Sequence, residues 1–175
     1  MKNDTMRRLQ ILAGRWTGRG VGNYPTIDAF RYDETLRFEL DPSYPLIHYE
    51  QRTRLIPSGE ASHWESGFIR VPENDVVEVS NSQDSGRVEV LRGGIDAAAA
   101  PTELRLVLDS VVLDHDPRLV RTRRVISVKN GELHYEVQMS TRTTATPKLQ
   151  GHLTAALRRI PADGSDDPRS TRGSG

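Results

Sequence analysis

The chain has 175 residues with 24 lysines and arginines against 24 aspartates and glutamates, which argues against a general binder of nucleic acid or anionic membranes because such proteins carry a basic surplus. It contains no cysteine, which excludes disulfides, thiolate metal sites and cysteine nucleophiles. No apolar run reaches the roughly 18 residues that span a bilayer, and we see no signal-peptide segment, so we expect a soluble, cytoplasmic protein.

The first predicted element is a short helix over residues 4–13. Asp4 can cap its N-terminus, and Met6, Leu9 and Ile11–Leu12 supply an apolar side. No other segment has a comparable pattern, because the alanines at 97–100 are bracketed too closely by glycine and proline to form more than a turn. We therefore predict one N-terminal helix.

A glycine-rich stretch follows this helix. Gly14, Gly18, Gly20 and Gly22 alternate with other residues, and Trp16 falls in the same series, so on a strand all five positions share one face. Missing side chains beside one large ring indicate a strand that bends sharply or lets another group approach closely. A phosphate-binding loop is excluded because no lysine-serine/threonine end and no following helix are present. A flexible leader is disfavoured because an exposed tryptophan is costly.

The remaining chain alternates apolar and polar residues between turn signals, which predicts short strands. Asn130-Gly131 is the strongest hairpin signal, since both central residues of a type I′ turn need positive φ. The pattern predicts an all-β antiparallel chain of roughly ten strands, closed into a barrel or packed as a sandwich. The apolar faces are expected to contain Leu36, Phe38 and Leu40; Val77 and Val79; Val88 and Val90; and Leu104, Leu106 and Leu108.

The end of the chain has a different composition. Residues 163–175 are polar, rich in glycine and serine, and contain no large apolar residue, which is typical of disorder. We therefore expect one domain over residues 1–162 and a disordered tail over residues 163–175.

The glycine-tryptophan pattern has a more specific meaning. Gly14-x-Trp16-x-Gly18-x-Gly20 resembles the signature of the nitrobindin family. Further segments in the same order are similar to that family, and together the resemblance covers residues 12–160. They are Tyr24-Pro25-Thr26-Ile27 with Phe30-Arg31-Tyr32; Tyr49 with Gln51-Arg52-Thr53; His63-x-Glu65-Ser66-Gly67-Phe68-Ile69-Arg70; Gln138-Met139-Ser140-Thr141; and His152-Leu153-x-Ala155-x-Leu157-Arg158-Arg159.

The resemblance implies a ten-stranded antiparallel up-and-down β-barrel, similar to lipocalins and fatty-acid-binding proteins, with a short N-terminal helix. It implies one heme b per chain at an open end of the barrel, with His152 as the axial ligand of the iron. It also implies a peroxynitrite isomerase that converts peroxynitrite to nitrate at ferric heme and binds nitric oxide. Small molecules would then be the partners, without nucleic acid or membrane.

The histidines can also be weighed by their chemistry. One neutral imidazole is enough to hold heme iron if the rest of the porphyrin is buried in an apolar pocket. The chain offers His48, His63, His115, His134 and His152. If Leu153 and Leu157 face the lumen, strict alternation sends His152 outward. It reaches the lumen only from the rim or through a β-bulge, and Gly151 favours either arrangement.

Other residues are candidates for the pocket by their place in the matched segments. Thr26 at the Tyr-Pro corner could approach a heme edge or cap the local turn. His63 and Phe68 lie on a strand that borders the family's pocket, where His63 could donate a hydrogen bond or restrict access. Met139 is expected to line the pocket. Arg118, Arg121, Arg123 and Arg124 replace the family's lysine near the propionates, and we take Arg121 as the candidate.

A second function stays open at this point. The alternation around His152 and the long connection before it are also compatible with a heme-free carrier of a small lipophilic ligand such as a fatty acid. In either case an exposed barrel strand could pair with its copy in a homodimer.

Overall fold

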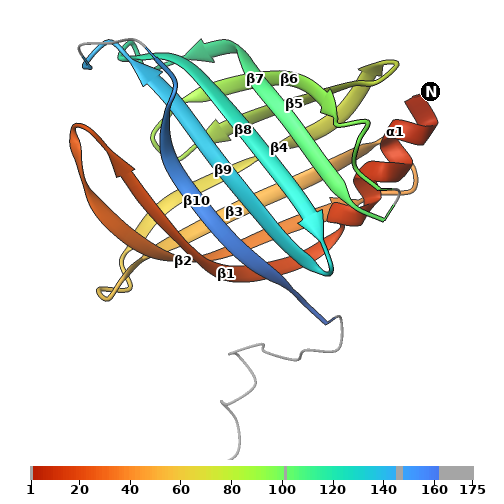
Figure 1. Cartoon of the computed structure of the whole chain (residues 1–175), viewed down its shortest axis with the longest axis horizontal. Helices are drawn as coiled ribbons and strands as arrows, with labels where there is room; N and C mark the ends of the chain where they lie inside the picture. Colours follow the sequence, from red (N-terminus) through yellow and green to blue (C-terminus); the bar gives the residue numbers. More distant parts are fainter. Residues whose placement is uncertain (1, 101, 145–147, 162–175) are drawn as a thin grey trace, which may run out of the picture.

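The computed structural model describes residues 2–100, 102–144 and 148–161, and within them the chain forms a closed barrel of ten antiparallel strands (Figure 1). Each strand pairs with its neighbours in sequence, and β1 pairs with β10 to close the barrel. The elements are α1 (Lys2–Leu9), the 3-10 helix η1 (Gln10–Leu12), β1 (Gly14–Tyr24), β2 (Ile27–Leu40), β3 (Leu46–Ile56), β4 (Ala61–Glu73), β5 (Val76–Gln83), β6 (Val88–Ile95), β7 (Leu104–Asp114), β8 (Leu119–Lys129), β9 (Glu132–Thr141) and β10 (Gln150–Ile160). The predicted fold class is confirmed, whereas the predicted tail over residues 163–175 lies outside the described residues.

Alternation places most of the predicted apolar residues in the barrel interior. Leu104, Leu106 and Leu108 on β7 are almost fully buried. The predicted hairpin at Asn130-Gly131 is also present, since both residues have positive φ, 52° and 77°.

One expected apolar face is wrong. Val88 is exposed, and it is Glu89 and Leu91 of β6 that are buried in the interior. Alternation alone assigns the two valines to the core, but buried Glu89 has an ion-pair partner on β8, which stabilises the opposite orientation of this strand.

The glycines of β1 make room for aromatic rings from β2. A Cβ atom added to Gly20 would lie 2.2 Å from the ring of Tyr32, and one added to Gly22 would lie 2.2 Å from the ring of Phe30. Register pairs Gly20 with Tyr32 and Gly22 with Phe30 across the two strands. The expected close approach of another group is therefore confirmed.

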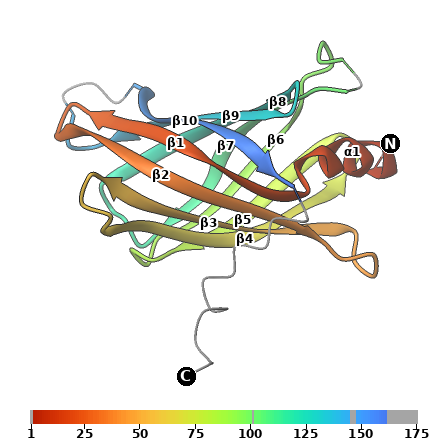
Figure 2. The same ribbon diagram turned by 90° about the horizontal axis from the view of Figure 1, so that it is seen from below.

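The N-terminal segment lies across one end of the barrel, and the β1–β2 hairpin reaches the opposite end (Figures 1 and 2). Leu9, Leu12 and Trp16 are fully buried in the core, and the Trp16 indole donates a hydrogen bond to the Leu12 carbonyl at 2.7 Å. The Arg159 guanidinium of β10 lies 4.3 Å from the Trp16 ring centre and donates to the Ile11 and Ala13 carbonyls. Among the described helices, none is long and apolar enough to cross a membrane.

Candidate functional site

A cavity of about 350 Å³ occupies the barrel interior and reaches the end opposite α1. Its rim includes Ile27, after the β1–β2 turn, and Asp84 and Arg87, which flank the β5–β6 turn. Its apolar wall contains Ile27, Phe30, Leu36, Phe38, Ile69, Val79, Leu108, Ile126, Val137, Met139 and Leu153. Burial of a flat, apolar ligand against such walls is favourable.

His152 reaches this cavity through a β-bulge. Gly151 pairs with Gln138 and Leu153 pairs with Val137, the next residue of β9, so His152 is the extra residue of β10. Both His152 and Leu153 line the cavity, which strict alternation would forbid. The bulge therefore brings the imidazole to the lining of the cavity at its rim, where His152 is partly buried.

The His152 ring is held in a defined orientation and tautomer. Its Nδ1 atom lies 3.0 Å from the Asn23 carbonyl oxygen, and because a carbonyl only accepts, Nδ1 must carry the proton. Burial lowers the pKa of His152 below its ordinary value, although the hydrogen bond to Asn23 opposes this shift. The ring also meets Tyr24 edge to face, with centroids 5.9 Å apart. The hydrogen bond to Asn23 and the lowered pKa both favour a neutral imidazole whose Nε2 lone pair has no hydrogen-bond partner among the described residues.

His63 lies on another wall of the same cavity. Around the barrel, three strands separate its strand β4 from β10 in one direction and five in the other, so the two histidines lie on different sides of the wall. The His63 Nε2 atom lies 3.1 Å from a Glu65 carboxylate oxygen, and Nδ1 lies 3.5 Å from Asp84 at the rim.

Of the six residues predicted for the site, the structure brings three together in the cavity: His63, Met139 and His152. Met139 on β9 is buried and packs with Tyr24 and Leu119.

The other three predicted residues do not line the cavity. Thr26 is exposed in the β1–β2 turn, next to the lining residue Ile27. Phe68 is exposed on the outer face of β4, with its ring centre 5.3 Å from that of His48. Arg121 is directed to Asp109, at 2.7 Å. Phe68 and Arg121 lie outside because His63 and Arg124 take the inward positions of their strands.

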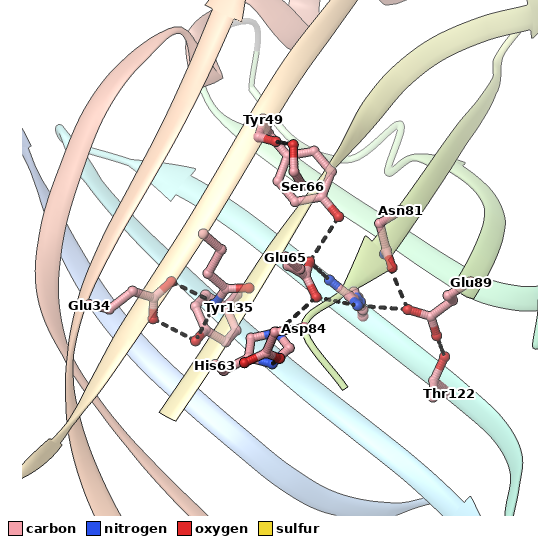
Figure 3. A network of polar contacts seen from close by, with 12 residues as sticks. Glu34, Tyr49, His63, Glu65, Ser66, Asn81, Asp84, Glu89, Thr122 and Tyr135 are labelled. Atoms are coloured by element: carbon pink, nitrogen blue, oxygen red, sulfur yellow. Dashed lines mark hydrogen bonds and ion pairs between the residues drawn. The ribbon is translucent and has the colours of Figure 1, made fainter. Parts of the chain in front are cut away.

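The interior also contains a charged cluster that the sequence did not reveal, formed by Glu65, Glu89 and Arg124. Figure 3 labels its two carboxylates, Glu65 and Glu89. Arg124 donates to Glu65 at 2.5 and 3.1 Å and to Glu89 at 2.6 Å. Burial by itself would raise the pKa of Glu65, but Arg124 and the His63 hydrogen bond outweigh burial and hold this pKa well below its ordinary value. The only signal in the sequence is a charged residue on an otherwise apolar strand face.

A second buried polar group surrounds Glu34 (Figure 3). Tyr135 donates a hydrogen bond to Glu34 at 2.6 Å, and the Gln51 amide donates to the other carboxylate oxygen at 2.8 Å. The hydroxyls of Tyr32 and Tyr135 are 2.8 Å apart. Burial raises the pKa of Glu34 to about 7, although the two hydrogen bonds oppose this shift.

At the rim, Arg87 is the basic residue best placed to meet an anionic ligand edge. It lines the cavity and pairs with Asp116 at 2.7 Å through one terminal nitrogen. Its Nε atom is buried and has no hydrogen-bond partner among the described residues. A buried donor of this kind favours a ligand carboxylate.

The arrangement fits heme better than a multi-ligand metal ion. Among the described residues no group of three or more metal-ligating side chains is gathered. A single imidazole at an apolar cavity is sufficient to hold heme iron, and a guanidinium donor at the rim suits the carboxylates of heme.

Comparisons with known proteins point the same way. A family model described as "THAP4-like, heme-binding beta-barrel domain" matches residues 5–159. Peroxynitrite isomerase 1 of Rhodococcus jostii (strain RHA1) is 39% identical over 146 residues, which cover 83% of this chain and 81% of that protein. A protein of Arabidopsis thaliana named peroxynitrite isomerase Rv2717c is 36% identical over 152 residues, 87% of each chain. The crystal structure of Rv2717c from M. tuberculosis has a TM-score of 0.79 and 29% identity, and the match covers 90% of this chain and 98% of that one.

Proposed function

The chain belongs to the family of THAP4-like heme-binding β-barrel domains, the nitrobindin family, and from that premise we propose that it binds one heme b and isomerises peroxynitrite to nitrate. The proposal gives His152 the role of axial ligand through Nε2. It gives Met139 and the apolar wall the role of burying the porphyrin faces, and His63 a place on the ligand side.

The observation that carries this proposal is the hydrogen bond between His152 Nδ1 and the Asn23 carbonyl. Ligating histidines in metalloproteins usually donate their second ring N–H to such an acceptor, which fixes the ring and strengthens the ligand. The bulge at His152 brings the free Nε2 lone pair to the cavity. Both features support ligation by this residue rather than an ordinary structural histidine.

Ferric heme, when bound, supplies a Lewis-acidic iron that weakens the O–O bond of peroxynitrite. The work of this chain is to orient the imidazole, exclude water with the apolar wall and restrict the space around a bound ligand. Nitric oxide is part of the proposal because a small uncharged ligand suits the same apolar cavity.

For the propionates we propose Arg87 in place of Arg121. The Arg87 side chain is at the rim with an unused buried Nε–H, whereas Arg121 pairs with Asp109 and does not line the cavity. The proposed heme site does not include Thr26, which is exposed in the β1–β2 turn, or Phe68, which is exposed on the outer face of β4.

The interior of the barrel does not support the alternative function, a heme-free carrier of a fatty acid. Arg124, the arginine that faces the interior from β8, already pairs with Glu65 and Glu89. A further carboxylate beside this pair would be repelled.

The cellular setting is also part of the proposal. Balanced charge and a small-molecule cavity support a cytoplasmic protein that works without nucleic-acid or membrane partners, and a homodimer stays a prediction.

Hemin titration of the purified full-length chain tests the proposal. Wild type should develop a Soret band at one heme per chain, and His152→Ala should lose most of it. His134→Ala is the matched control, since His134 is exposed on the neighbouring strand and pairs with Glu132. Wild type loaded with hemin should also speed peroxynitrite decay and raise the yield of nitrate over nitrite. An absent Soret band, or one that survives in His152→Ala, would count against the proposal.

A further inference from the structure

His63 is held between two carboxylates of different accessibility. Its Nε2 atom lies 3.1 Å from Glu65, which is 2% exposed, and its Nδ1 atom lies 3.5 Å from Asp84, which is 45% exposed at the rim. One ring nitrogen therefore faces the buried cluster, and the other faces the mouth of the cavity and water. Figure 3 shows Asp84 and Glu65 beside the His63 ring.

The contact between His63 Nε2 and Glu65 determines which ring nitrogen of His63 carries the proton. Glu65 accepts from Tyr49 at 2.8 Å and from both terminal nitrogens of Arg124. An ionised carboxylate that accepts from a guanidinium has no proton to donate. The close His63 nitrogen, Nε2, must therefore be the donor in its contact with Glu65.

We propose that Glu65, paired with Arg124, fixes His63 as the Nε2–H tautomer, so that Nδ1 beside Asp84 is the ring atom that exchanges protons at the cavity mouth. Glu65 and Arg124 are then positioning residues, and Asp84 is the link to water. Glu34 on β2 and His152 on β10 are further described groups whose charges interact with that of His63.

The consequence for the reaction rests on the proposed function. Peroxynitrous acid that enters the cavity transfers its O–H proton to the Nδ1 lone pair, which leaves peroxynitrite anion and a His63 imidazolium. The imidazolium returns this proton to water by way of Asp84. Only one O–H bond breaks and one N–H bond forms, so no further reactant is needed.

The tautomer can be measured directly by ¹⁵N NMR of the histidine side chains. The labelled full-length chain without added hemin would be studied as a pH series, and the tautomer would be read at the alkaline end, where the histidine shifts no longer change. Wild type should show His63 protonated at Nε2. A spectrum with the proton on Nδ1 would overturn the proposal.

Two matched variants test the role of Glu65. Glu65→Gln and Glu89→Gln each remove one of the two carboxylates on Arg124, but only Glu65 contacts His63. Because a glutamine amide can donate to Nε2, Glu65→Gln should shift His63 toward the Nδ1–H tautomer, whereas Glu89→Gln should leave it unchanged. Equal changes in the two variants would overturn the assignment, and the wild-type spectrum decides if Glu65→Gln does not fold.

Azide binding tests the role of Asp84 in the hemin-loaded chain. Asp84→Asn should leave the tautomer of His63 unchanged. It should slow azide association at pH 6 by about two- to fivefold, the size expected from the loss of one partly exposed ion pair between Asp84 and the His63 imidazolium. Asp114→Asn, an exposed carboxylate of β7 that pairs with His115, should have no effect. Equal rates in both variants and wild type would overturn the role of Asp84. If hemin gives no Soret band, the proposed function fails, and the NMR result still decides the inference on Glu65.

Discussion

The Nδ1 atom of His152 lies 3.0 Å from the carbonyl oxygen of Asn23, a residue 129 positions earlier in the chain. Asn23 is near the end of β1 and His152 is near the start of β10, the two strands whose pairing closes the barrel. The strand pairing that closes the barrel therefore also orients the His152 imidazole. His152, the proposed axial ligand, acquires its hydrogen-bond partner only when the last strand meets the first.

Tyr24 supports the same ring from the side, which makes its edge contact testable. Tyr24→Leu removes the aromatic edge that meets His152 at 5.9 Å, and we expect hemin affinity to fall by about tenfold, as for other outer partners of metal ligands. Tyr24→Phe is the control, because it keeps the ring and loses the hydroxyl contacts to Thr141 and to the Met139 carbonyl. Soret titrations that give equal losses in both variants would contradict the role of the ring.

Met139 lines the cavity and Phe68 lies on the outer face of the barrel, so we expect their replacement by alanine to affect hemin affinity differently. Met139→Ala opens space in the cavity lining and should weaken hemin binding, since it removes buried apolar contact with the ligand. Phe68→Ala changes only the outer face of β4 and should leave hemin affinity within twofold of wild type. Both affinities come from Soret titration. A large effect of Phe68→Ala would show that the cavity extends to a face where we do not place it.

The fate of Phe68 shows what a matched motif can and cannot predict. The segment from His63 to Arg70 correctly indicated a strand at the pocket, but only alternate residues of a strand face the lumen. Buried Glu65 sets that parity, and Phe68 falls on the other face. Arg121 fails for a related reason, because Arg124 occupies the inward position of β8.

At His152 and Glu89, strict alternation of inward and outward residues predicts the wrong side-chain orientation. The antiparallel all-β chain of roughly ten strands, the hairpin at residues 130–131 and the purpose of the β1 glycines follow from local patterns, whereas the choice of a closed barrel over a sandwich comes from the family resemblance. The bulge at His152 breaks the rhythm of β10, and Gly151 is its only local signal. Glu89 faces inward because it pairs there with Arg124. Arg124 is 35 residues away in the sequence, so this pairing leaves no mark in the local pattern of β6.

The close approach at Gly20 predicts a large loss of stability from one methyl group. In Gly20→Ala the new Cβ would lie 2.2 Å from the Tyr32 ring, so the ring must shift, and we expect a loss of about 1–3 kcal/mol. Gly151→Ala is the control, since nothing lies within 4 Å of its Cβ position, and its change should stay within about 0.5 kcal/mol. Urea unfolding measures both. Equal losses would contradict the packing argument.

Arg124 is expected to be essential for stability, in contrast to the neighbouring arginine. Arg124→Met leaves two buried carboxylates without their cation, and we expect a loss of about 3–5 kcal/mol. Arg123→Met removes a half-exposed pair with Asp109 and should cost no more than about 1 kcal/mol. The free energies of unfolding in urea at pH 7 make this comparison. Similar values for the two variants would refute the idea of a buried ion cluster.

Glu34 predicts an unusual dependence of stability on pH. Burial raises its pKa to about 7 in the folded chain, whereas in the unfolded chain it titrates near its ordinary value. Between these two values the folded state binds more protons, so the free energy of unfolding falls as pH rises. Glu34→Gln removes this titration but keeps a neutral side chain of the same shape.

The difference between wild type and Glu34→Gln isolates Glu34 from other groups. Burial lowers the pKa of His152, which makes stability rise with pH near 6, but this contribution is common to both proteins. Glu65 titrates in acid and lies outside the window. From pH 5 to pH 8, wild type should therefore lose about 2–3 kcal/mol relative to Glu34→Gln in urea unfolding. Parallel curves would mean that the folded barrel leaves the Glu34 carboxyl at its ordinary pKa, in conflict with its burial between Tyr135 and Gln51.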